Sequence, residues 1–107
     1  MGRRTLLGAD EVAALLPPGW TGDTRQIRRE WTFGSYAAGL DFAVRVAQAA
    51  EAADHHPDIL LAYRRVRVTF WTHDAGGVTR MDMAGAQAVD LLACSSPLPT
   101  PTPPGPA

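Results

Sequence analysis

Two segments of the 107-residue chain alternate between apolar and polar side chains, and this alternation constrains the fold more than any other feature. In residues 27–33, every second position falls on one face, which carries Ile27, Arg29, Trp31 and Phe33. In residues 66–73, one such face carries Val66, Val68, Phe70 and Thr72. Period-two alternation with aromatic and β-branched residues is typical of strands with one buried face. The sequence therefore predicts a half-buried strand in each segment.

A long helix is predicted between these strands, over Tyr36–Ala53, with Ser35 as its N-cap. Its polar side chains form one stripe, Asp41, Arg45 and Gln48, and apolar residues occupy most of the remaining surface. A helix that is apolar beyond one stripe must bury two sides. We expect one side to cover the sheet and the other to be a candidate subunit interface.

The remaining segments complete a regular order of elements. A short helix follows Asp10 and is stopped by Pro17-Pro18-Gly19, and Trp20 opens a short strand. A strand over Asp58–Tyr63 is joined to the segment 66–73 by a tight turn at Arg64-Arg65. A last helix is capped by Thr79, with Asp82 completing a Thr-x-x-Asp pattern.

The predicted order is helix, strand, strand, helix, strand, strand, helix. Hairpins imply antiparallel pairing, and helices must cover the apolar face of the sheet. The predicted class is α+β, a two-layer sandwich whose four-stranded antiparallel sheet is covered by helices. We place this domain at residues 5–94. Residues 95–107 are expected to form a disordered tail, because six of the nine prolines lie after residue 96.

Charge and cysteine content exclude several classes of protein. Ten basic residues, all arginine, against eleven acidic ones give a net charge of −1, which argues against a nucleic-acid binder. No apolar run approaches the roughly 20 residues of a membrane span, and the N-terminus lacks the apolar core of a signal peptide. One cysteine, Cys94, allows neither an internal disulfide nor a cysteine-rich zinc site, so a cytoplasmic location is expected.

All three histidines fall at the ends of predicted elements. His55 and His56 follow the long helix, and His73 closes the last strand. Because the intervening hairpin returns the chain to its starting end, the three imidazoles are expected to converge there. Acidic residues accompany them in the sequence: Glu51, Asp54, Asp58, Asp74 and Asp82.

Three interpretations of the histidines compete. They are surface or capping residues, ligands of a metal ion, or general acids and bases acting on a small molecule. Joint chelation is awkward because adjacent extended residues point in different directions. No Gly-x-Ser-x-Gly motif is present, and Cys94 has no histidine near it in sequence, so covalent catalysis has no support. Acid–base catalysis is the favoured interpretation, with no metal site.

The sequence resembles the pterin-4a-carbinolamine dehydratase family over about residues 8–94. The resemblance rests on an acid followed three residues later by Asp-His-His-Pro (Glu51 and residues 54–57), then Tyr63, the run His73-Asp74-Ala75-Gly76-Gly77, and Asp82. Gly19-Trp20 and the alternating segment 27–33 also fit. Trp71 departs from the family, whose members usually carry a small residue there, and is expected either to line the pocket or to pack against another subunit.

The resemblance implies an enzyme, a hydro-lyase, that dehydrates a 4a-hydroxytetrahydropterin to the quinonoid dihydropterin without metal or organic cofactor. It also implies a homodimer or homotetramer that supports an aromatic amino-acid hydroxylase. From charge and apolar run length, we expect no nucleic-acid or membrane partner. The alternative is a binding or assembly factor of the same fold that stabilises a partner protein.

The resemblance also implies roles for individual residues. His55 and His73 are expected to transfer protons and His56 to position the substrate. Candidate substrate-binding residues are Asp54, Pro57, Thr72, Asp74 and Ala75. Glu51 and Asp82 are candidate orienting residues, and for Asp82 helix capping is an equally good explanation.

Overall fold

The computed structural model describes residues 5–95, which form three helices and four strands. They follow the order α1 (Ala9–Leu15), β1 (Thr21–Gly22), β2 (Ile27–Thr32), α2 (Tyr36–Ala53), β3 (Asp58–Ala62), β4 (Arg65–Phe70) and α3 (Arg80–Ser95). The predicted α+β class and element order are therefore confirmed. The tail predicted over residues 95–107 lies, beyond Ser95, outside the described residues.

The sheet is antiparallel throughout, in the order β1-β2-β4-β3. Its central pair joins the two alternating segments, so that Ile27 lies opposite Phe70 and Trp31 opposite Val66. Residues directly opposite one another point to the same face. This register places the two apolar faces on one side of the sheet, and all four of these side chains are buried.

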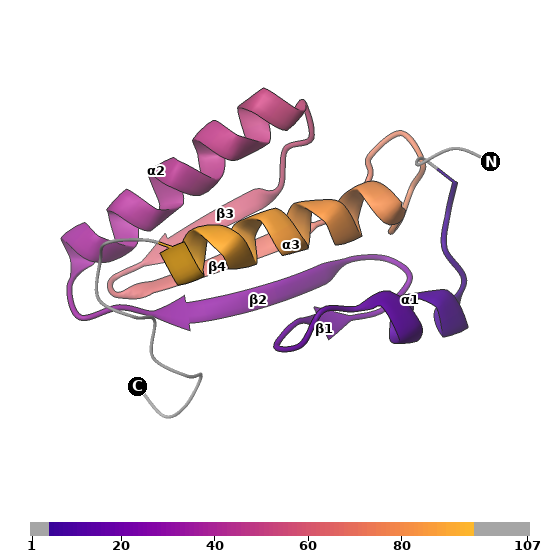
Figure 1. Ribbon diagram of the computed structural model, residues 1–107, viewed down its shortest axis with the longest axis horizontal. Coiled ribbons are helices and arrows are strands. Elements are labelled where there is room, and N and C mark those ends of the chain that lie inside the picture. The colour runs from indigo at the N-terminus through magenta and orange to yellow at the C-terminus, as the bar shows by residue number, and fades with distance from the viewer. Residues whose placement is uncertain (1–4, 96–107) are drawn as a thin grey trace.

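Helices α2 and α3 lie side by side over that apolar face (Figure 1). Helix α1 contributes Val12 to the core. Aromatic side chains fill the space between the layers: Trp31 and Phe42 meet edge to face, with ring centroids 5.0 Å apart. The opposite face of the sheet is polar, and there Glu30 pairs with Arg65 and Arg67. The molecule is thus a two-layer sandwich with one open sheet face.

Both ends of α2 are fixed by local contacts. The Ser35 hydroxyl accepts a hydrogen bond from the Ala38 amide at 3.1 Å, which confirms the predicted N-cap. Asp54 takes a left-handed conformation, with φ of 54°, and the His55 amide donates to the Ala50 carbonyl at 3.2 Å. This left-handed cap ends the helix and directs the next residues toward the sheet.

Two predicted boundaries are wrong. The turn between β3 and β4 occupies Tyr63 and Arg64, because Arg65 already pairs with Ala62, and Tyr63 takes the positive φ of 53°. The last strand ends at Phe70 and does not extend to His73. Pro57 immediately precedes β3 and has no amide hydrogen to donate to β4, so the pairing between β3 and β4 stops at Asp58. Thr72 forms only an isolated bridge with Gly77.

Within residues 5–95, no helix combines the length and the apolar character needed to cross a membrane.

Candidate active site

Three segments meet at one end of the sheet. The loop that carries His55 and His56 precedes β3, and the turn that carries His73 follows β4. Since Asp58 pairs with Thr69, the start of β3 and the end of β4 lie together. A hydrogen-bonded network that links His55 to Asp82 brings in the first turn of α3. The structure therefore places all three histidines at the predicted end of the sheet.

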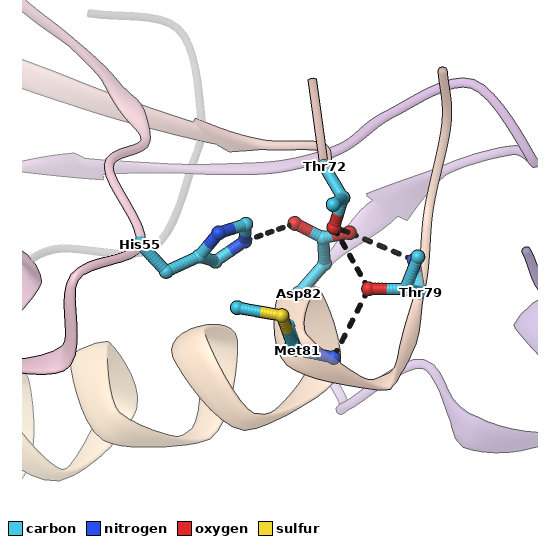
Figure 2. A network of polar contacts seen from close by, with 5 residues as sticks. All are labelled: His55, Thr72, Thr79, Met81 and Asp82. Atoms are coloured by element: carbon cyan, nitrogen blue, oxygen red, sulfur yellow. Dashed lines mark hydrogen bonds and ion pairs between the residues drawn. The ribbon is translucent and has the colours of Figure 1, made fainter. Parts of the chain in front are cut away.

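A buried carboxylate organises this end of the molecule (Figure 2). Asp82 is fully buried, and its Oδ1 lies 2.6 Å from Nε2 of His55. Its Oδ2 accepts hydrogen bonds from the Thr79 amide at 2.8 Å and from the Thr72 hydroxyl at 2.9 Å. The Thr79 hydroxyl lies 2.7 Å from that of Thr72 and accepts from the Met81 amide at 3.2 Å. One side chain therefore caps α3 and holds a histidine.

The network has only one consistent direction of donation. The Thr72 hydroxyl gives its hydrogen to Asp82, so the Thr79 hydroxyl must donate to Thr72. An ionised carboxylate can only accept, so Nε2 of His55 must be the donor to Asp82. This arrangement fixes the proton of neutral His55 on Nε2 and leaves Nδ1 with a lone pair. Nδ1 is then the atom of His55 that can exchange a proton with a substrate.

The ring of His55 is also packed against apolar groups. It stacks on Phe70, with ring centroids 5.7 Å apart and planes at 18°. Beside it, between α2 and α3, lies a cavity of about 120 Å³ whose walls are otherwise apolar, including Val46, Met81 and Val89. With 11% of its side chain exposed, His55 lies at the boundary between core and solvent. The contacts with Asp82 and Phe70 together restrict the ring of His55 to one plane.

His56 and Glu51 form a separate pair at the surface. Nε2 of His56 lies 2.8 Å from Oε1 of Glu51, and both side chains are largely exposed, at 57% and 81%. An exposed pair of this kind contributes little to stability. Its position next to His55 in the chain makes it a candidate for orienting a bound molecule.

His73 lies in the turn that follows β4 and is held in a third way. The turn is closed by hydrogen bonds from the Thr72 amide to the Gly77 carbonyl and from the Gly76 amide to the Thr72 carbonyl, both at 2.9 Å. The imidazole of His73 lies against the indole of Trp71, with ring centroids 4.4 Å apart. Trp71 and His73 therefore lie on the same side of the chain.

The candidate substrate-binding residues differ in accessibility. Asp54 and Asp74 are exposed, and Pro57 and Ala75 are half-buried. Thr72 is 1% exposed, and its hydroxyl points into the network around Asp82. Four of the five thus reach the surface near the histidines.

Each of the three histidines is held by different neighbours. No group of three or more histidine, cysteine, aspartate or glutamate side chains within residues 5–95 is arranged to hold a metal ion. The geometry suits proton transfer by individual imidazoles.

Two contributors were not anticipated from the sequence. Phe70 was expected only as a core residue, although its position two residues before Thr72 on the same face indicates a place beside the network. Thr79 was expected only as a helix cap, yet its hydroxyl also extends the network to Thr72. The cavity beside His55 has no signal in the sequence, because it arises from small residues on two separate helices.

Comparisons with known proteins agree with this geometry. The family model of pterin 4 alpha carbinolamine dehydratase matches residues 5–92. A protein from Mycobacteroides abscessus, provisionally named pterin-4-alpha-carbinolamine dehydratase, is 41% identical over 87 residues, which cover 79% of this chain and 93% of that protein.

Two solved structures are also similar. A transcriptional coactivator/pterin dehydratase from Brucella melitensis has a TM-score of 0.76 and 33% identity, over 81% of this chain and 97% of that one. A pterin dehydratase-like protein identified as a RuBisCO assembly factor in the alpha-carboxysome has a TM-score of 0.58 and 29% identity, over 72% and 89%. With the fold, the histidine arrangement and these similarities in agreement, the chain belongs to the pterin-4-alpha-carbinolamine dehydratase family.

Proposed function

We propose that this chain dehydrates a 4a-hydroxytetrahydropterin, the 4a-carbinolamine, to the quinonoid dihydropterin by general acid–base catalysis. The observation that carries the proposal is the 2.6 Å contact between Nε2 of His55 and the buried carboxylate of Asp82. A buried carboxylate that fixes the tautomer of an imidazole is the arrangement that proton-transferring histidines use. Chain membership in the family supplies the class of substrate.

The proposed reaction consists of one bond cleavage and two proton transfers. Carbon 4a carries a hydroxyl group and an amine nitrogen. A histidine in its acidic form protonates the hydroxyl group, the nitrogen lone pair moves toward carbon 4a, and the C4a–O bond breaks to release water. A second histidine, in its neutral form, takes the proton from the nitrogen of the resulting cation. One proton leaves the protein and one returns, so neither a redox partner nor a cofactor enters the balance.

Roles follow from how each histidine is held. His55, with its Nδ1 lone pair, and His73, at the surface of the turn, are assigned to the proton transfers. His56, paired with Glu51, is assigned to positioning the substrate. Asp82 orients His55, and the substrate contacts are assigned to Asp54, Pro57, Asp74, Ala75 and the backbone around Thr72.

Removal of the two proton-transferring imidazoles tests the proposal. We expect His55→Ala and His73→Ala each to lower kcat about 10²–10⁴-fold, the usual contribution of general acid–base catalysis. His56→Ala is expected chiefly to raise KM. The measurement is the decay of a carbinolamine substrate followed by absorbance, with circular dichroism to verify folding.

Asp41→Asn, which changes an exposed ion pair on α2, is the control and should leave the rate unchanged. Carbinolamine decay at the spontaneous rate with the unaltered protein would contradict the proposed enzyme function.

We further infer that the protein acts as a homodimer or homotetramer in the cytoplasm, where it supports pterin recycling by an aromatic amino-acid hydroxylase. Support for assembly comes from a row of apolar side chains on α2, at spacing i, i+4, i+8, that faces away from the core. Tyr36 is 52% exposed, and Leu40 and Val44 are each 45% exposed. Such a row on one helix face is typical of a surface that another protein surface covers.

A second candidate function is that of a non-catalytic assembly factor, which the likeness to the RuBisCO assembly factor favours. Co-purification of a partner complex, lost when the exposed face of α2 is altered, together with carbinolamine decay at the spontaneous rate would support this alternative. The presence of all three histidines, each with its own supporting group, favours the enzyme.

A further inference from the structure

We propose that Trp71 is a positioning residue for His73, whose imidazole it holds in one orientation by ring contact. The contact itself is independent of the activity, whereas its kinetic consequence rests on the proposed dehydratase function. Trp71 lies outside the set of histidines and carboxylates to which the chemistry has been assigned.

The backbone places the two rings next to each other. Thr72 lies between them, and its side chain points inward to Asp82. The contact between the two rings shows that the side chains on either side of Thr72 lie together. The hydrogen bond between the Thr72 amide and the Gly77 carbonyl, together with that from the Gly76 amide to the His73 carbonyl, fixes this stretch. Trp71 and His73 are therefore held on one side by a rigid turn.

The rings themselves are in close contact. Their centroids are 4.4 Å apart, and their planes are tilted by 34°. Aromatic pairs in proteins have centroids roughly 4.5–7 Å apart, so this pair is packed slightly closer than the usual range. At this distance and tilt, the indole packs against a face of the imidazole, whose nitrogen atoms lie at the ring edge. Because Trp71 is itself half-buried, it is the less mobile partner.

His73 needs such support more than the other histidines do. His55 is held by Asp82 and Phe70, and His56 is paired with Glu51. His73 is exposed, and Trp71 provides the side-chain contact that restricts it. Without the indole, the imidazole would sample its three χ1 wells and two χ2 orientations. A base or acid distributed over several rotamers spends only part of its time in the reactive one.

Kinetics of three variants test the inference. Trp71→Leu keeps an apolar side chain but removes the ring, and we expect kcat to fall about 3- to 6-fold, in proportion to the number of rotamers released. KM is expected to change less than about twofold, because Trp71 does not bind the substrate. Trp71→Phe, which retains an aromatic ring, should restore kcat to within about twofold. Tyr63→Leu, which removes an exposed aromatic ring at the far end of β4, is the matched control and should change neither constant.

Nuclear magnetic resonance supplies a readout that does not depend on activity. The Cε1 and Cδ2 protons of His73, assigned by their loss in His73→Gln, should be displaced upfield by the indole ring current. The displacement should persist in part in Trp71→Phe and disappear in Trp71→Leu. If Trp71→Leu does not fold, nuclear Overhauser effects between the two rings in the unaltered chain decide: their presence supports the inference and their absence overturns it.

The outcomes separate this inference from the proposed function. An upfield displacement in a chain with no dehydratase activity supports the ring contact and rejects the enzyme function alone. An active enzyme whose His73 signals are the same in Trp71→Leu overturns the inference alone. A rise in KM with kcat unchanged also overturns it, because Trp71 would then bind the substrate directly.

Discussion

Asp82 performs two tasks with two oxygens. Oδ2 accepts from the amide of Thr79 and so caps α3, while Oδ1 contacts His55. The contact that caps α3 and the contact with His55 are both present, so capping does not exclude the proposed orienting role. Because the Thr79 amide and the Thr72 hydroxyl both donate to this carboxylate, its remaining oxygen accepts from His55, and its negative charge decides which nitrogen of His55 carries the proton.

The substitution Asp82→Asn removes the negative charge of this side chain but keeps its size and shape. The amide must present its carbonyl oxygen to Thr79 and Thr72, so its NH₂ group faces Nε2 of His55. Nε2 must then accept, and the proton moves to Nδ1, the nitrogen that needs a lone pair. We expect kcat to fall by about 10²-fold or more and the free energy of unfolding to fall by about 1–3 kcal/mol. Carbinolamine decay and urea denaturation measure the two effects.

A second carboxylate on α3 provides the matched control. Asp90 accepts hydrogen bonds from the indole of Trp20 at 3.0 Å and from Arg29 at 3.2 Å, away from the histidines. Asp90→Asn should lower stability while leaving kcat unchanged. A normal rate in Asp82→Asn, or an equal loss of rate in both variants, would show that Asp82 does not orient His55.

At this scale, the sequence predicted which residues gather but not how they are joined. The Thr-x-x-Asp pattern predicted the cap, because its contacts are local. The contact between His55 and Asp82 spans 27 residues, and no local pattern determines which ring nitrogen makes it. The stacking of Phe70 on His55 likewise depends on how α2, β3 and β4 pack together.

At the scale of elements, a glycine of α3 lies against a ring of β4 that belongs to the site. A Cβ added at Gly85 would lie 2.6–2.7 Å from ring carbons of Phe70, closer than real atoms approach. Phe70 in turn stacks on His55. The close approach of α3 to β4 at Gly85 therefore helps to set the position of the His55 ring.

Gly85→Ala is expected to disturb both stability and rate. Alanine favours the helix by about 1 kcal/mol, but overpacking costs about 1–3 kcal/mol, so the free energy of unfolding should fall. The displaced Phe70 ring should also lower kcat. Gly34→Ala is the control, because an added Cβ there meets nothing within 4 Å. Equal stability and rate in Gly85→Ala would mean that α3 shifts freely on the sheet.

The elements themselves were largely predictable. Alternation identified β2 and β4, and Ser35 marked the start of α2, because both signals reflect local burial and local hydrogen bonding. The turn at Tyr63 and Arg64 was misplaced by one residue, since neither carries a turn preference and cross-strand register decides the boundary. The end of β4 at Phe70 likewise depends on the neighbouring strand, so the sequence of β4 alone does not reveal it.

At the scale of the whole molecule, two surfaces with exposed apolar side chains are candidates for the proposed contact with a second copy. One is the row on α2 that includes Leu40, 45% exposed, and the other is the free edge of the sheet at β3, where Leu60 is 48% exposed. A charge introduced into a buried interface is strongly unfavourable. A charged substitution on one surface therefore tests that surface without altering the other.

Sedimentation of charged variants tests the proposed assembly. If both surfaces are used, the unaltered chain should sediment as a tetramer, and Leu40→Glu and Leu60→Glu should each produce smaller species. Ala13→Glu, on the exposed side of α1, should leave the mass unchanged. A fully active monomer would show that the proposed homo-oligomer is not needed for function.

The double role of Asp82 limits how this protein can be made more stable. A capping box favours glutamate at the position that Asp82 occupies, so helix engineering would recommend Asp82→Glu. The additional methylene would carry the carboxylate past the geometry that now reaches both the Thr79 amide and His55 at 2.8 and 2.6 Å. Thermal stability and turnover thus depend on the same side chain, so changes that stabilise this protein must be made elsewhere in the fold.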